Sequence, residues 1–407
     1  MRVEGQGSLT SAPASRTIVV AGAGIAGLTA AIALAEQRFH VVVLEKAAQL
    51  DDAGAGIQLS PNASGVLIGL GLEKHLAERV VAPDDITIVA ARSGRSIVRI
   101  PLGSSARMRY GAPYWIAHRA DLQAALLERA RENPDIDLHL AAPFEDVAVH
   151  AKGVTVVNRE GLERESRQAV ALVGADGVWS NVRHQHFGGV PALFSGHVAW
   201  RATVEARQLP REFSQNRVML WLGTGAHLVL YPLRSGALVN IVAIVAGQWN
   251  RPGWNEAGDT SEIFAHFNSA SWSRAARMIV GAADNWRKWA LFTVDGTAVA
   301  DGPVALIGDA GHAMLPFAAQ GAAMAIEDAA VLADCLGRQP TNPVEAFRQY
   351  AALRQSRVAQ VRRTTWQSGA IYHLPGVIAL ARNLTMKVLG GGRLLSQRDW
   401  LYDWRSV

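Results

Sequence analysis

Short apolar runs recur along the chain, and most of them end at glycine or acidic residues. The runs at 17–21, 40–44, 170–173 and 304–307 each have the length of a buried strand. Alanine-rich segments follow the first and the last of these runs, and such segments have strong helix propensity. Buried strands that alternate with helices predict an α/β fold around a parallel sheet.

The pattern changes between residues 197 and 247. Four strand-like runs lie there, at 197–204, 217–222, 227–231 and 238–245. Glycine-containing turns separate the last three, and successive hairpins predict an antiparallel sheet. We expect a further hairpin at 87–100, and helices with several tryptophans at 250–290 that cover this sheet.

These patterns together predict a Rossmann-type nucleotide-binding domain with an antiparallel β-sheet substrate domain inserted into it. The nucleotide-binding domain is expected to take residues 17–82, 110–190 and 291–340, and the substrate domain residues 83–109 and 191–290. Residues 1–16 are polar and small, which favours a disordered leader over a signal peptide. Residues 341–407 are expected to be helical, with a break at Gly390–Gly392 and an aromatic tail, 400–404, that packs against the protein.

Composition narrows the class of protein. The single cysteine, Cys335, excludes an internal disulfide framework and a cysteine-based metal cluster, and we expect no metal site. No apolar run reaches the ~18 residues of a membrane span, so we expect a cytoplasmic protein without a membrane partner. The net charge is +5. Arg354, Arg357, Arg362 and Arg363 have helical spacing without stacking aromatics, which favours a solvated face over a nucleic-acid partner.

The first apolar run leads into a glycine-rich turn and a helix. The turn is Gly22-Ala23-Gly24-Ile25-Ala26-Gly27, and Glu45-Lys46 follows the second strand. Glycines at this spacing allow a tight turn and a close approach to a pyrophosphate, and the carboxylate accepts bonds from ribose hydroxyls. The motif predicts a dinucleotide site, and it does not separate FAD from NAD.

Other candidate residues follow later strands. Asp176 lies between glycines after the 170–173 run, where it is either a turn former or a ligand of the nucleotide. Arg119 begins a helix, either as a surface ion-pair residue or as a cofactor contact. After the 304–307 run, Gln320-Gly321-Ala322-Ala323 begins a helix whose unpaired N–H groups suit a planar, electron-rich ligand.

Within the antiparallel region, His227 and Tyr231 are four residues apart on one strand and therefore share a face. From the residues alone, they are either a half-buried structural pair or a catalytic pair. Arg201 and Arg234 are either partners for a substrate carboxylate or surface and interstrand residues.

Three of these stretches together resemble a known family. Residues 22–27 with Glu45, 174–177, and 308–309 leading into 320–322 are similar in order and spacing to the three signatures of single-component FAD-dependent aromatic hydroxylases of the para-hydroxybenzoate hydroxylase type. The resemblance covers nearly the whole chain. Within that family, 54–58, 115–122 and 227–232 look most like salicylate, 3-hydroxybenzoate and 6-hydroxynicotinate hydroxylases.

The resemblance implies roles for individual residues. Asp309 would bond the ribityl chain of FAD, Arg119 and Gln58 would contact FAD, and Asp176 would hold FAD and the transient nicotinamide donor. The isoalloxazine would lie along 316–323. The full implied cofactor set is Gly22, Ala23, Gly24, Ile25, Ala26, Gly27, Glu45, Lys46, Gln58, Arg119, Asp176, Asp309, Pro316, Gly321, Ala322 and Ala323. The implied substrate set is His227, Tyr231, Leu315, Pro316 and Phe317.

The family reaction follows from the same resemblance. NADH or NADPH reduces FAD, and a C4a-hydroperoxyflavin formed with O2 hydroxylates a small phenolic aromatic or heteroaromatic acid. His227 is the expected base for the phenolic proton, with Tyr231 completing a hydrogen-bond relay. The alternatives are halogenation or epoxidation on the same fold, or a non-catalytic nucleotide-binding module. We expect a monomer or a homodimer.

Overall fold

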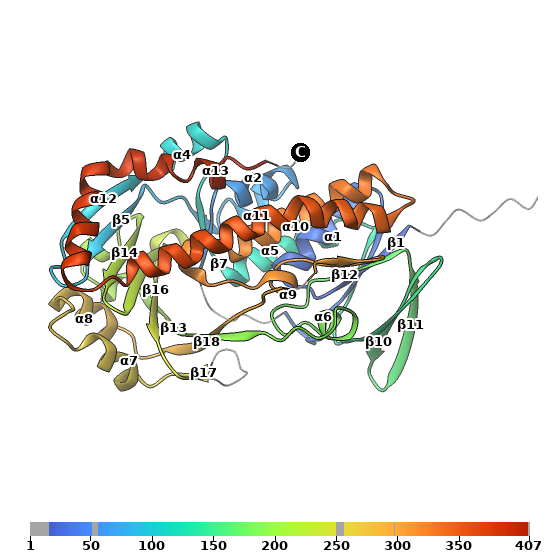
Figure 1. Cartoon of the computed structure of the whole chain (residues 1–407), viewed down its shortest axis with the longest axis horizontal. Helices are drawn as coiled ribbons and strands as arrows, with labels where there is room; N and C mark the ends of the chain where they lie inside the picture. Colours follow the sequence, from blue (N-terminus) through green and yellow to red (C-terminus); the bar gives the residue numbers. More distant parts are fainter. Residues whose placement is uncertain (1–15, 51–55, 250–255, 297, 406–407) are drawn as a thin grey trace, which may run out of the picture.

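The computed structural model describes residues 16–50, 56–249, 256–296 and 298–405. The predicted leader, apart from Arg16, and residues 54 and 55 of the 54–58 stretch lie outside the described residues. The described chain folds around two large sheets that lie side by side (Figure 1). No helix within the described ranges is long and apolar enough to cross a bilayer.

The first sheet has six strands in the order β19-β20-β12-β1-β2-β8. All neighbours run parallel except the edge pair of β19 and β20. The strands are β1 (Thr17–Ala21), β2 (His40–Leu44), β8 (Ile136–His139), β12 (Ala171–Gly174), β19 (Ala300–Asp301) and β20 (Val304–Leu306). The order places β1 at the centre, as in a Rossmann-type sheet. The four apolar runs predicted to be buried strands all contribute to this sheet.

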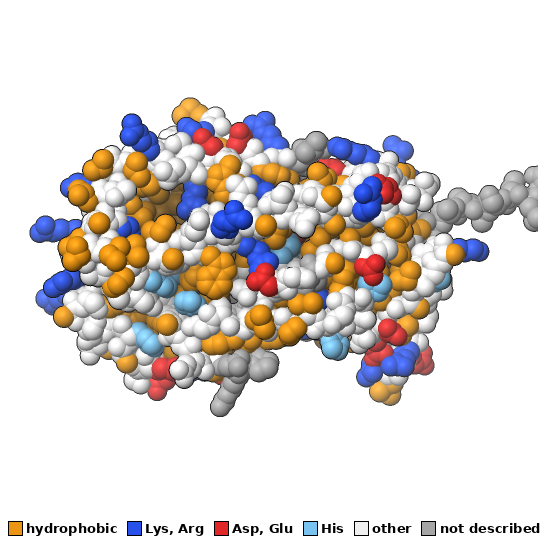
Figure 2. Space-filling view, viewed as in Figure 1, with side chains coloured by type: hydrophobic (Ala, Val, Ile, Leu, Met, Phe, Trp, Pro, Cys, Tyr) orange, Lys and Arg blue, Asp and Glu red, His pale blue; other side chains and the backbone are white. Residues whose placement is uncertain are grey.

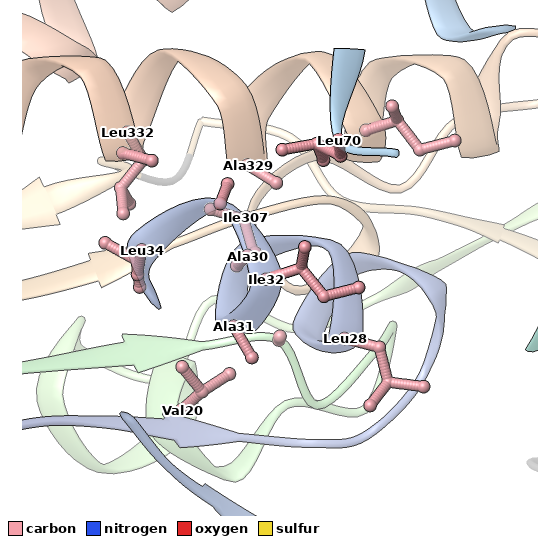
Figure 3. Packing of buried hydrophobic residues seen from close by; sticks show 14 of the residues in the cluster. Val20, Leu28, Ala30, Ala31, Ile32, Leu34, Leu70, Ile307, Ala329 and Leu332 are labelled. Carbon is pink, nitrogen blue, oxygen red and sulfur yellow. The ribbon is translucent and has the colours of Figure 1, made fainter. Parts of the chain in front are cut away.

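Helix α1 (Ile25–Glu36) lies between this sheet and α10 (Gly321–Arg338) (Figure 3). Its side chains are buried on nearly every side, because the sequence is apolar around the whole helix. Val20 faces it from β1, and Ala329 and Leu332 face it from α10. Small alanines let the two helices approach closely, so the N-termini of both are fixed relative to the ends of the strands.

The second sheet has eight strands in the order β17-β18-β13-β16-β15-β14-β5-β6. Its strands are β5 (Asp85–Ala90), β6 (Ser96–Pro101), β13 (Leu193–Glu205), β14 (Arg217–Gly223), β15 (Ala226–Leu233), β16 (Leu238–Ala246), β17 (Glu256–Ala257) and β18 (Arg287–Thr293). Neighbours are antiparallel except β14 and β5, which run parallel. The predicted 87–100 hairpin is confirmed as β5 and β6.

The hairpins predicted among the last three of the four strand-like runs are confirmed as β14–β15 and β15–β16. The consecutive strands β13 and β14 do not pair, because β16 and β15 lie between them. The connection at 206–216 is long enough to cross, and it buries Leu209 and Phe213 on the way. The predicted tryptophan-bearing cover is confirmed: α7 (Thr260–Phe267) and α8 (Arg274–Gly281), with Trp272 and Trp286, pack against Trp200 and Trp221 of the sheet in one core cluster.

Smaller elements complete the fold beside the two large sheets. Two three-stranded sheets consist of β3 (Gly56–Leu59), β7 (Trp115–His118) and β4 (Val80–Val81), and of β9 (Phe144–His150), β10 (Gly153–Glu160) and β11 (Glu163–Ala169). The short helices are α2 (Pro61–Gly69), α3 (Glu73–Leu76), α4 (Gly103–Tyr110), α5 (Arg119–Arg131), α6 (Asn181–His186) and α9 (Asp309–His312). The overall arrangement is the predicted α/β fold with an inserted sheet and a helical C-terminal part; the residue bounds of the domains stay a prediction.

The C-terminal part extends over both sheets. Helix α11 (Pro343–Tyr372) runs from the parallel sheet towards the eight-stranded sheet, and α12 (Gly376–Ser396) then packs on β6 (Figure 1). The predicted break is confirmed at Gly390, whose φ is +71°. Helix α13 (Asp399–Tyr402) ends the fold. The outer face of α12 exposes apolar side chains, which gather over this end of the molecule (Figure 2).

Candidate active site

A cavity of about 660 Å³ is lined by residues of both large sheets. One side, which we call the Rossmann wall, consists of the carboxyl ends of β1, β2 and β12 and the loop before α10. The other side, the mixed-sheet wall, consists mainly of β5, β14, β15, β16 and β18, with Arg201 from β13, and α12 and α13 close the cavity. Carboxyl ends of parallel strands are where open α/β sheets bind ligands.

Three glycines shape the turn between β1 and α1. A Cβ at Gly22, whose φ is +107°, would lie 2.5 Å from the carbonyl oxygen of Ala175. A Cβ at Gly27 would lie 1.8 Å from the carbonyl oxygen of Gly22. Gly24 differs, because it lines the cavity and a Cβ there would meet nothing within 4 Å. The N-terminus of α1 is therefore open to an anion from the cavity.

The N-terminus of α10 also opens onto the cavity. Gly321 lines it, and a Cβ at this position would meet nothing within 4 Å. The helix has no side-chain cap and no acidic residue in its first turn, so its first N–H groups are free of such partners. Gln320 is held back instead, because its Nε2 donates to Ser60 Oγ at 2.9 Å and its Oε1 accepts from Asn62 Nδ2 at 3.2 Å.

Two carboxylates follow the strands of the Rossmann wall. Glu45 Oε2 accepts from the Ala23 N–H at 2.7 Å, which ties the end of β2 to the glycine turn. Asp176 Oδ2 accepts from the N–H groups of Asn181 and Val182 at 2.7 and 3.1 Å, so Asp176 is indeed a turn former. Its Oδ1 is buried without a hydrogen-bond partner, and Asp176 lines the cavity. Burial raises the pKa of this carboxyl.

Three more expected cofactor residues line the same wall. Gln58 Oε1 accepts from the Tyr114 hydroxyl at 2.8 Å. Arg119 begins α5, and Asp309 begins α9. Burial raises the pKa of Asp309, while Arg119 and His312 act in the opposite direction.

Most of the expected site residues line the cavity. On the cofactor side these are Gly22, Gly24, Ile25, Ala26, Glu45, Lys46, Gln58, Arg119, Asp176, Asp309, Pro316, Gly321 and Ala322. On the substrate side they are His227, Tyr231, Pro316 and Phe317. Ala23, Gly27, Leu315 and Ala323 are not among the lining residues, and Leu315 and Ala323 are buried in the core.

His227 and Tyr231 lie on β15 in the mixed-sheet wall. No hydrogen bond joins the two side chains in the described part of the chain. His227 Nδ1 lies instead 2.9 Å from Nε2 of His373. Burial, together with His373 and His197, holds the pKa of His227 well below its usual value. Burial raises the pKa of Tyr231 to about 12, so its hydroxyl is protonated at neutral pH.

Phe317, in the loop before α10, contacts three imidazole rings. Its ring centroid lies 5.4 Å from those of His197 and His227 and 5.7 Å from that of His373, each in an edge-to-face arrangement. A Cβ at Gly369 of α11 would lie 2.4 Å from the Phe317 ring, so glycine is required for α11 to pass. The apolar ring thus forms a dry boundary beside His227.

The two arginines considered as carboxylate partners have different surroundings. Arg234 donates to both carboxylate oxygens of Asp121, at 3.2 and 3.1 Å, on the surface. Arg201 lines the cavity, stacks on Trp289 with 5.2 Å between the guanidinium carbon and the ring centroid, and leaves its Nε without a partner. Burial lowers the pKa of Arg201, with Tyr231 acting against this. No carboxylate within the described residues forms an ion pair with it.

A buried ionic network supports the α10 end from behind. Arg354, 2 % exposed, donates from Nε to Asp328 Oδ1 at 2.6 Å and from Nη1 to Glu327 Oε2 at 2.7 Å. Asp328 Oδ2 accepts from the Gly308 N–H at 2.8 Å and contacts His312 Nε2 at 2.5 Å. Burial alone would raise the pKa of Asp328, but His312 and Arg354 lower it to about 2.

The expected solvated arginine face is therefore wrong for two of its members. Arg354 is buried, and Arg357 donates to Glu327 and to the carbonyl oxygens of Trp400 and Leu401. Arg363 is exposed as expected. Helical spacing of arginines is the same for a solvated face and for a buried network, so the spacing alone could not separate the two.

Sequence reasoning also missed several lining residues. Tyr114, Trp289, Tyr372 and Tyr402 line the cavity and come from distant parts of the chain. The aromatic tail, residues 400–404, was expected only to pack against the rest of the protein. Trp404 does contact the guanidinium of Arg354, with 5.6 Å to the ring centroid, whereas the neighbouring Leu401 and Tyr402 line the cavity. No local pattern marks these residues, because they come from separate elements that only the tertiary fold brings together.

Comparisons with known proteins agree with this geometry. The model of the FAD binding domain family matches residues 15–365. The chain is 35% identical over 395 residues to a 3-hydroxybenzoate 6-hydroxylase of Polaromonas naphthalenivorans (strain CJ2), covering 96% of this chain and 97% of that protein. It is 37% identical over 392 residues to a 3-amino-4-hydroxybenzoate 2-monooxygenase of Streptomyces platensis, covering 96% of each.

The solved structures include a salicylate hydroxylase in complex with substrate. The TM-score to it is 0.80, at 25% sequence identity, and the match covers 96% of each chain. The family match spans most of the chain, and the curated relatives match it along nearly their whole length. The chain therefore belongs to the FAD binding domain family, and within it to the FAD-dependent aromatic hydroxylases.

Proposed function

We propose that the protein is a monooxygenase that hydroxylates a small phenolic aromatic acid, with O2 and NADH or NADPH as co-substrates. The observation that carries the proposal is that Arg201, His227 and Tyr231 line one cavity with the open N-terminus of α10. A phenolic acid presents a carboxylate, a ring and an ionisable hydroxyl, and this wall has a partner for each. The hydroxybenzoate names of two relatives support the same substrate class.

The residues of the Rossmann wall fit FAD. The open spaces above Gly24 and Gly321 let a ligand approach two helix N-termini, and the unpartnered Oδ1 of Asp176 can accept a bond from it. In the proposed complex, Glu45 binds the ribose, α1 binds the pyrophosphate, Asp309 binds the ribityl chain and the α10 end faces the isoalloxazine. FAD, when bound, supplies the redox chemistry that activates O2 for ring hydroxylation.

Arg201 is the proposed partner of the substrate carboxylate. The Nε of Arg201 is buried without a partner, which is costly, and an anionic ligand that pairs with the guanidinium removes that cost. Its stacking on Trp289 fixes the plane of the guanidinium. The carboxylate would therefore be held in one orientation, which sets the position of the phenolic hydroxyl relative to His227.

His227 is the proposed proton acceptor. Its lowered pKa keeps the imidazole neutral at neutral pH, so it can accept a proton, and Nδ1 is engaged with His373. Nε2 is the atom that remains for the phenolic proton. The protonated Tyr231 hydroxyl can donate a hydrogen bond to the phenolate that forms. The ring of Phe317 excludes water from this side of the site.

The test is a coupled turnover screen. The purified yellow holoprotein is mixed with NADH or NADPH and with 2-, 3- or 4-hydroxybenzoate or 3-amino-4-hydroxybenzoate, and nucleotide oxidation, O2 uptake and products are measured. We expect at least one acid to give hydroxylated product mole for mole with oxidised nucleotide. Benzoate, which lacks the hydroxyl, should give hydrogen peroxide without hydroxylated product. Peroxide alone with every phenolic acid would overturn the proposal.

A further inference from the structure

His227 lies between the cavity and a second histidine. His227 lines the cavity and is 2% exposed, whereas His373 is half-buried and is not among the lining residues. The two imidazoles face each other with 2.9 Å between His227 Nδ1 and His373 Nε2. The pair therefore leads from the inside of the cavity through its wall to the protein surface.

The position of His373 is determined by a helix end and not by the sheet that carries His227. His373 is the C-cap of α11, and its N–H donates to the Gly369 carbonyl oxygen at 3.2 Å. The passage of α11 beside Phe317 depends on Gly369, as described above. The same helix end thus places both the dry boundary of the site and the second imidazole.

The charged and titratable groups around the pair are few. His197, on β13, has its ring centroid 6.0 Å from that of His373, but its Nδ1 lies 3.0 Å from the carbonyl oxygen of Ser195. Arg382, on α12, lies near His373 and acts against its protonation. The ring centroid of Tyr372, at the end of α11, lies 5.4 Å from that of His227. No carboxylate in the described ranges pairs with either ring.

A proton cannot remain on this pair. Burial, with His197 and Arg382 as further causes, lowers the pKa of His373 to about 4, and the pKa of His227 is lowered as well. Both imidazoles are therefore neutral at neutral pH, each with one N–H and one free nitrogen. Neutral imidazoles joined by a hydrogen bond can pass a proton along by exchanging N–H bonds, without either ring staying charged.

We propose that His373 is a positioning and relay residue that carries the phenolic proton from His227 to solvent. The substrate O–H bond breaks and an N–H bond forms at His227 Nε2. The N–H bond at His227 Nδ1 breaks and one forms at His373 Nε2, and His373 Nδ1 gives its proton to water. The electron pair of the broken O–H bond stays on the phenolate oxygen, so nothing is oxidised or reduced.

This inference rests on the proposed function, and its test follows proton release, not turnover. The oxidised holoprotein, without NADH or NADPH, is mixed with 3-hydroxybenzoate in weak buffer containing phenol red. Binding is followed by the change in the flavin spectrum, and proton release by the dye. We expect His373→Gln, which keeps a hydrogen bond but cannot pass a proton, to slow proton release at least tenfold while changing Kd less than threefold.

Two further variants separate relay from packing. His373→Ala leaves a space at the surface, and added imidazole should restore fast proton release there, whereas pyrrole, of similar size but without a basic nitrogen, should not. His197→Gln is the matched control, because His197 borders the same rings but bonds neither of them; we expect the wild-type release rate. If pyrrole restores release as well as imidazole does, His373 acts by packing and the relay is overturned.

The outcomes distinguish the two proposals. If the wild type binds and hydroxylates 3-hydroxybenzoate and His373→Gln releases the proton at the wild-type rate, the relay is wrong and the proposed function stands. If the wild type binds and hydroxylates 3-hydroxybenzoate but releases no proton on binding, the relay is also wrong. If the wild type neither binds 3-hydroxybenzoate nor passes the turnover screen, both proposals are wrong.

Discussion

The two walls of the cavity are made in different ways. The Rossmann wall is mostly backbone: glycines, strand ends and two helix N-termini, with Gly24 and Gly321 leaving space above them. The mixed-sheet wall is made of side chains such as Arg201, His227 and Trp289, each from a different strand. A wall made of backbone is disturbed when a side-chain atom is added to a glycine. A wall made of side chains is disturbed when a side chain is removed. We therefore expect side chains of the mixed-sheet wall to be exchangeable without disturbing the Rossmann wall.

The largest effect is expected from the buried ionic network of Arg354, Glu327 and Asp328, which packs behind the Rossmann wall. Arg354→Met would leave Glu327 and Asp328 buried with one cation fewer, and we expect a loss of about 3–5 kcal/mol in the free energy of unfolding. Urea unfolding of the holoprotein measures it. Arg363→Met, on the exposed side of the same helix, is the control and should stay within about 0.5 kcal/mol of wild type. Equal effects would show that the network does not support the wall.

Removal of a side chain from the mixed-sheet wall should affect catalysis alone. We expect Arg201→Met to lower kcat/KM for the preferred phenolic acid at least about a hundredfold, because a charge partner of the carboxylate is lost. FAD content, read from the visible spectrum, should stay that of wild type. Arg234→Met removes an arginine paired on the surface, and its kcat/KM should not change. A loss of FAD in Arg201→Met would contradict the separation of the two walls.

One added methyl group should distinguish two glycines of the same turn. Gly27→Ala places a Cβ against the Gly22 carbonyl, and we expect it to cost about 1–3 kcal/mol of stability. Gly24→Ala meets nothing in the protein, and its φ of −73° suits alanine, so the stability of the apoprotein should not change. Its FAD affinity should fall instead. Thermal unfolding of the apoproteins and flavin fluorescence titration measure the two effects, and the reverse pattern would refute the assignment.

The smallest expected effect is on pH dependence. The pKa of His373 is lowered to about 4 in the folded protein, so the unfolded chain binds the extra proton first as the pH falls below about 6.5. Stability from this group is therefore present at neutral pH and is lost between pH 6.5 and 4. Because the ring is half-exposed, we expect wild type to lose roughly 1 kcal/mol more than His373→Gln between pH 7 and 5.5. Parallel stability curves would contradict this.

The Rossmann wall was predictable because its contacts are local. Gly22, Gly24 and Gly27 lie within one turn, and the bond from Ala23 to Glu45 joins neighbouring strands of one βαβ unit. These residues lie close together in the fold because they are close in the sequence or belong to one βαβ unit. The same holds for Gly321, which begins the helix directly after its loop.

The mixed-sheet wall was only partly predictable. The shared face of His227 and Tyr231 follows from the two-residue period of a strand. The hydrogen bond from His227 to His373 does not, because it joins residues 146 positions apart through the crossing of α11. The position of Arg201 against Trp289 likewise depends on β13 pairing with β18, which no local pattern in the sequence indicates.

The order of strands along the chain has a consequence for synthesis on the ribosome. Strand β20 joins β12 only after the whole eight-stranded sheet has been made, and the open end of α10 follows β20. Tyr402, which closes the cavity, comes later still. The glycine turn near residue 24 is thus made early, whereas the full set of residues that line the cavity is available only after α13 has left the exit tunnel.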